Sequence, residues 1–132
     1  VLYWKSAYPK FGKNAVWLDG RNKNPFFKPT LENMQRLKEK GIDIIAPPIP
    51  VLVRTIENGE LALTDYARFA KSVGLRIMTW TFESYRVNTA LYSQTPGRML
   101  EVLDFLSEEV GVIGIFSDWP GTVTYYANCM IR

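Results

Sequence analysis

Three carboxylates follow short apolar runs in this sequence, where a strand would end. They are Asp19, Glu83 and Asp118. Carboxylate oxygens from neighbouring strand ends can hold a divalent cation or orient a substrate. Nothing in the spacing of these three residues requires them to meet at one metal ion. The chain contains no histidine, so it lacks the side chain that most often moves protons in hydrolysis near neutral pH.

Two other residue types at the same strand ends could contact a ligand. Arg21 follows Asp19, and its guanidinium could hold a phosphate oxygen through a bidentate contact. A salt bridge within the loop is the alternative for Arg21. The prolines at 47, 48 and 50 indicate a rigid turn after another strand, and a purely structural stop is the simplest interpretation of them.

Three segments share one pattern, in which an amphipathic helix ends at a glycine and an apolar strand follows. In the first helix, Thr30 is the expected N-cap, and Leu31, Met34 and Leu37 lie on one face. A glycine after a helix commonly has the positive φ of a C-cap. The predicted helices are 30–40, 64–73 and 98–110, the glycines are Gly41, Gly74 and Gly111, and the strands are 42–46, 75–80 and 112–116.

A strand at 15–19 and a helix at 122–130 extend the pattern to four strands, each followed by a helix. Repeated units of this length favour an α/β fold with parallel strands. Four consecutive βα units are half of an eight-stranded barrel, or a short open sheet. In a barrel, ligands bind at the carboxyl ends of the strands. The loops predicted at 47–63 and 82–97 lie at this end and are long enough to contact a ligand.

The last predicted helix carries the single cysteine of the chain. Tyr125, Tyr126 and Cys129 are expected to pack against the barrel wall, with Cys129 buried as a small apolar residue. One cysteine cannot form a disulfide within the chain, and pairing with a cysteine of another chain is the alternative.

Composition indicates a single folded domain over residues 1–132, with 47% hydrophobic residues and a net charge of +3. The basic residues are dispersed apart from a group near the start. That group consists of Lys10, Lys13, Arg21, Lys23 and Lys28. No nucleic-acid-binding motif accompanies it, so we expect no nucleic-acid partner. No run reaches the ~18 apolar residues of a membrane span. The chain begins without a methionine or a signal peptide, and we expect it to start within a longer polypeptide.

Three motifs together resemble the glycerophosphodiester phosphodiesterases. The stretch LRIMTWTFE (75–83) resembles the seventh-strand motif of that family, in which a Trp-Thr pair ends the strand. GVIGIFSDWP (111–120) resembles the last-strand motif, and KPTLENMQRLKEKGIDIIAPP (28–48) resembles the preceding helix and strand. The order and spacing of the motifs match from about Ala15 onward.

The resemblance implies a TIM barrel that hydrolyses glycerophosphodiesters to glycerol 3-phosphate and an alcohol. The family uses two histidines as general acid and base, and acidic residues hold a divalent metal, usually Mg²⁺ or Ca²⁺. These residues belong to the first half of the barrel, and their His-Arg-Gly, Glu-x-Asp and His-Asp motifs are absent here. The chain therefore resembles the C-terminal half of the barrel, without catalytic residues or metal ligands of its own, and we expect it to be inactive alone.

The resemblance also implies substrate-binding roles for four residues. Trp80 would line the pocket against the glycerol moiety of the substrate; a core position is the alternative. Asp118 stands at the family's Asp position and would orient a catalytic group or contact substrate; an N-cap for the last helix, with Pro120 in its first turn, is the alternative. Glu83 replaces the usual Asn and either binds substrate or faces solvent. Arg21 would hold the phosphate.

A half-barrel leaves two strand edges and an apolar face uncovered, so we expect a cover for them. A complementary N-terminal half-barrel, in the same polypeptide or in a second chain, would make a complete enzyme. Self-association or a partner protein would instead suit a non-catalytic binding or structural module. An unrelated nucleotide-binding sheet is disfavoured because no glycine-rich loop follows a strand. Family members with similar motifs are often exported, which favours a periplasmic or secreted protein.

Overall fold

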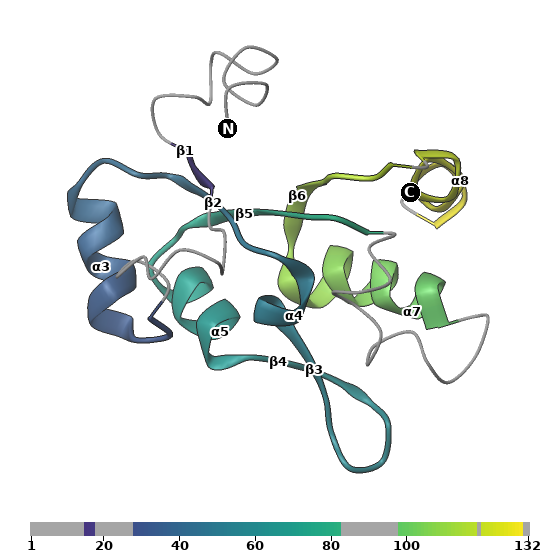
Figure 1. Cartoon of the computed structure of the whole chain (residues 1–132), viewed down its shortest axis with the longest axis horizontal. Helices are drawn as coiled ribbons and strands as arrows, with labels where there is room; N and C mark the ends of the chain where they lie inside the picture. Colours follow the sequence, from purple (N-terminus) through teal and green to yellow (C-terminus); the bar gives the residue numbers. More distant parts are fainter. Residues whose placement is uncertain (1–14, 18–27, 83–97, 119, 131–132) are drawn as a thin grey trace.

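A parallel sheet of four strands forms the centre of the molecule in the computed structural model, which describes residues 15–17, 28–82, 98–118 and 120–130. Within this sheet, the strands lie side by side in the order in which they occur along the chain, as Figure 1 shows. The strands, in spatial order, are β1 (Ala15–Trp17), β2 (Ile44–Ala46), β5 (Arg76–Thr79) and β6 (Val112–Ile115). The prediction of an α/β fold with parallel strands is confirmed.

Helices cover one side of this sheet (Figure 1). They are α3 (Leu31–Glu39), α5 (Asp65–Ser72) and α7 (Arg98–Phe105), and α7 continues into the π-helical turn η2 (Leu106–Val110). Ile45 and Ile77 of the sheet are buried in one apolar cluster with residues of all three helices. The helical members of this cluster include Met34, Leu37, Ala67, Ala70, Val102 and Leu106. Burial of this apolar surface is the main force that joins the helices to the sheet.

The helix ends follow the sequence signals closely. The Thr30 hydroxyl accepts a hydrogen bond from the Asn33 N–H at 3.2 Å, so Thr30 is the N-cap of α3 as predicted. The three glycines that follow the helices all have positive φ, between 72° and 76°. A residue with a Cβ is strained in this conformation, which explains why glycine stands at each helix-to-strand junction.

The segment 47–63 is not the loop predicted from the sequence. It holds the short helix α4 (Ile49–Leu52) and an antiparallel hairpin of β3 (Val53–Thr55) and β4 (Leu61–Leu63). Pro50 lies in the first turn of α4, where the missing N–H costs nothing. The hairpin turns at Asn58 and Gly59, and Gly59 has a φ of 84°. An Asn-Gly pair between short apolar runs is a hairpin signal that the interpretation as a loop missed.

Some predicted buried positions are exposed. In α8 (Pro120–Met130), Tyr126 is buried, but Tyr125 is 63% exposed and Cys129 is also exposed. The predictions for Tyr125 and Cys129 were therefore wrong. The helix packs against α7 along one narrow face, and the Tyr126 hydroxyl donates to Asp104 Oδ1 at 2.8 Å.

None of the helices in the described ranges is long and apolar enough to cross a membrane.

Candidate functional site at the strand ends

Side-chain hydrogen bonds join the carboxyl ends of β2 and β5. The Thr79 hydroxyl donates to the Pro47 carbonyl at 2.8 Å, and the Trp80 indole Nε1–H donates to the Ala46 carbonyl at 2.8 Å. Proline has no N–H, so Pro47 and Pro48 cannot donate to the backbone ladder at this point. The side chains of Thr79 and Trp80 supply hydrogen bonds between the two strand ends there, and the bond from Nε1 fixes the position of the Trp80 ring.

The end of β6 lies next to the same residues. The Phe116 N–H donates to the Thr79 carbonyl at 2.9 Å, and the Phe82 N–H donates to the Phe116 carbonyl at 2.9 Å. Backbone hydrogen bonding between the segments of β5 and β6 therefore continues beyond the ends of the two strands. Asp118 follows Phe116 by two residues, so it lies at the same edge of the sheet as Trp80.

Trp80 and Phe116 follow directly on the last residues of β5 and β6, and both are half-buried. Of the two preceding residues, Thr79 is fully buried, and Ile115 packs against the apolar cluster beneath the helices.

Two of the four predicted substrate-binding residues, Trp80 and Asp118, are in the described part of the chain. Both lie at the strand-end edge, Trp80 half-buried and Asp118 exposed. Arg21 and Glu83 lie outside the described residues. Helix α8 (Pro120–Met130) starts two residues before the predicted helix at 122–130, and Pro120 stands in its first turn.

The family resemblance implies a divalent metal, with its ligands outside this chain. No group of three or more His, Cys, Asp or Glu side chains lies close enough together there to hold a metal ion. Of the three carboxylates that the sequence suggested, only Asp118 is described, since Asp19 and Glu83 are not. The described residues therefore do not fit a metal centre, and no chemical step is assigned to one.

The structural role of Thr79 was missed from the sequence. Its hydroxyl is fully buried, and its acceptor, the carbonyl of Pro47, lies 32 residues away in the chain. Such a pair becomes visible only when the register of β2 against β5 is known. The sequence offers one signal: a threonine stands next to a tryptophan in one predicted strand, and a second predicted strand ends in prolines.

Comparison with known proteins places the chain beside a longer relative. No family model matches the sequence. A protein of Arthroderma benhamiae named "Extracellular protein" is 31% identical over 143 aligned residues, which cover 98% of this chain and 58% of the relative. The chain therefore spans less than two thirds of the length of that relative.

Proposed function

We propose that this chain forms the C-terminal half of a TIM barrel that hydrolyses glycerophosphodiesters to glycerol 3-phosphate and an alcohol. The observation that carries the proposal is the arrangement at the strand-end edge. Trp80 donates a hydrogen bond to the Ala46 carbonyl there, and the segment that runs from β6 to Asp118 lies alongside. This is the edge at which barrel enzymes bind their substrates. The motif resemblance supplies the substrate class.

The topology supports a barrel rather than a doubly wound sheet. A doubly wound sheet reverses its strand order at a switch point and carries helices on both faces. The described strands run in the unreversed order β1-β2-β5-β6, and the helices α3, α5 and α7 pack on one side of them. Continuing this arrangement through four more units would close a barrel with Trp80 at the carboxyl ends of its strands.

In the proposed enzyme, the residues of this chain bind and orient the substrate. The Trp80 ring offers an apolar surface for the carbon chain of the glycerol moiety, and its fixed indole loses little conformational entropy on binding. The Asp118 carboxylate accepts a hydrogen bond from a glycerol hydroxyl or orients a group of the complementary half. Arg21 pairs with a phosphate oxygen, and Glu83 contacts the polar part of the substrate.

The catalytic histidine pair and the ligands of a Mg²⁺ or Ca²⁺ ion come, in this proposal, from a complementary N-terminal half-barrel. That half belongs to the same polypeptide or to a second chain. The relative of Arthroderma benhamiae is longer than the segment it shares with this chain, as a whole barrel would be. Its name, "Extracellular protein", supports a secreted location.

The proposal is tested on the protein purified with whatever polypeptide carries or accompanies the chain. Hydrolysis of glycerophosphocholine is followed by release of choline in the presence of Mg²⁺ or Ca²⁺. Asp118→Asn is expected to reduce kcat/KM about tenfold or more, because a hydrogen bond to a charged group contributes about 1.5–3 kcal/mol. Glu57→Gln, an equivalent change on the exposed hairpin turn, should leave kcat/KM unchanged. Equal rates for the two variants would remove Asp118 from the site.

A non-catalytic half-barrel is the second candidate. It is favoured by the absence of histidine from the whole sequence, and by the lack of a metal-ligating cluster among the residues that the structure describes. In that case the open strand edges are covered by self-association or by a partner protein. A stable homodimer that binds glycerophosphocholine without hydrolysing it would support this candidate.

A further inference from the structure

A cavity of about 580 Å³ opens on the surface between the start of α5, helix α4 and the β3–β4 hairpin. Pro29, Val51 and Tyr66 form an apolar wall, and Arg54, Asp65 and Arg68 supply charge. Neither Trp80 nor Asp118 lines this cavity. It is therefore separate from the strand-end site, and the inference below does not depend on the proposed enzyme activity.

The apolar wall of the cavity is held by hydrogen bonds that centre on Thr64. The Thr64 hydroxyl accepts from the Ala67 N–H at 3.2 Å and donates to the Val51 carbonyl. The Thr64 N–H donates to the Leu52 carbonyl at 3.1 Å. These bonds tie α4 to the first turn of α5. The Tyr66 side chain beside them is almost fully buried, at 2% exposure, so this wall is packed rather than mobile.

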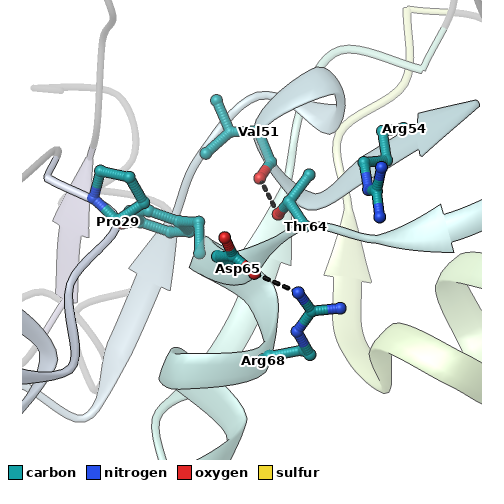
Figure 2. A pocket seen from close by; sticks show the side chains of 7 residues that line it. Pro29, Val51, Arg54, Thr64, Asp65 and Arg68 are labelled. Carbon is teal, nitrogen blue, oxygen red and sulfur yellow. Dashed lines mark hydrogen bonds and ion pairs between the residues drawn. The ribbon is translucent and has the colours of Figure 1, made fainter.

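The two guanidinium groups reach the cavity from different elements. Arg54 projects from β3, where it pairs with Ala62 of β4, and Arg68 projects from α5. Both face the same space in Figure 2. The Asp65 carboxylate already pairs with Arg68. Among the described residues, no carboxylate forms an ion pair with Arg54. The described lining of the cavity therefore carries two positive charges and one negative charge.

We propose that this cavity binds a small organic anion, with Arg54 as the main anchor of its carboxylate or phosphate group. Arg68 contributes a second donor, and Pro29 and Val51 contact the apolar body of the ligand, with the buried Tyr66 packed behind them. A guanidinium matches the planar oxygen pair of either anion. The volume is that of a typical small-molecule site and exceeds what an inorganic ion would fill.

The test uses isothermal titration calorimetry of the full chain with three probes of similar shape: phenyl phosphate, phenylacetate and neutral benzyl alcohol. Saturable binding of phenyl phosphate or phenylacetate, at least tenfold tighter than that of benzyl alcohol, is expected. The tighter of the two anions identifies the natural ligand as a phosphate monoester or a carboxylate. Binding should also weaken as salt rises from low to physiological concentration, because the site is open to solvent.

The variant Arg54→Gln should weaken binding of the preferred anion about tenfold or more, since it removes a charged donor. Arg36→Gln is the matched control, because Arg36 is exposed on α3 and pairs with Glu32 at 3.3 Å. It should leave the affinity unchanged. Arg54 is exposed, so its replacement is not expected to unfold the chain, and circular dichroism of the variant checks this. Equal binding of the neutral probe, no binding at millimolar concentration, or an unchanged affinity in Arg54→Gln would each overturn the proposal.

Discussion

The indole Nε1–H of Trp80 donates to the carbonyl of Ala46 at 2.8 Å, and it joins two strand ends that lie 34 residues apart in the chain. The neighbouring Thr79 hydroxyl makes the equivalent bond to Pro47. The pair holds β2 and β5 together at the point where prolines interrupt the backbone ladder. The hydrogen bond to the end of β2 therefore fixes the position of Trp80, which is the proposed substrate contact.

Thr79→Val should destabilise the chain by about 1–2 kcal/mol. The valine keeps the volume of threonine but leaves the buried Pro47 carbonyl without this donor. Urea denaturation followed by circular dichroism measures the change. Thr124→Val, an exposed position on α8, is the control and should change the free energy of unfolding by less than about 0.5 kcal/mol. Equal effects of the two changes would argue against a structural role for the Thr79 hydroxyl.

Tyr126→Phe should loosen the attachment of α8. The substitution removes the hydrogen bond to Asp104 that links α8 to α7, at an expected cost of about 0.5–1.5 kcal/mol. The adjacent Tyr125 is 63% exposed, so Tyr125→Phe provides a matched control with little expected effect. Hydrogen exchange of the α8 amides should become faster in the first variant only. Unchanged exchange in Tyr126→Phe would show that apolar packing alone holds the helix.

The chain should lose stability above about pH 10. Burial raises the pKa of Tyr66 in the folded chain above the usual tyrosine value near 10. Burial, followed by the hydrogen bond to Asp104, raises the pKa of Tyr126 as well. The unfolded chain therefore loses these protons first as the pH rises. The stability they contribute is complete below pH 10 and declines as the pH rises through that value toward the folded pKa.

Tyr66→Phe tests this alkaline effect, because phenylalanine keeps the ring and removes the ionisable group. The loss of stability between pH 9 and pH 11, measured by urea denaturation at each pH, should be smaller in this variant than in the unchanged chain. Tyr125→Phe should not alter the loss, since Tyr125 is exposed. An identical pH profile for Tyr66→Phe would contradict the assignment.

The main elements were predictable because their signals are local. Thr30 and the glycines at 41, 74 and 111 mark helix ends through the conformations they favour, and all four occupy the predicted positions. Apolar periodicity likewise located the helices that cover the sheet. The strands were also predicted at the correct places. Their parallel arrangement was predictable because strands joined by a helix at this spacing pair in parallel.

The remaining features depend on contacts between distant segments. The exposure of Cys129 follows from how far the apolar cluster extends, and a helical pattern alone does not contain that information. The bond from Thr79 to Pro47 requires the register between two strands. The hairpin after α4 was different, because its Asn58-Gly59 turn was a local signal that went unused.

Glycerophosphocholine hydrolysis across the fractions of a native size-exclusion column tests the central proposal most directly. The protein is purified from its source, and choline release is measured in each fraction with Mg²⁺ or Ca²⁺ present. The proposal predicts that activity elutes with a species heavier than the 15.2 kDa of this chain, and that this species contains histidine-bearing polypeptide in addition to residues 1–132. Hydrolysis by the 15.2 kDa chain alone would contradict the account of a half-barrel, and no hydrolysis in any fraction would contradict the assigned activity.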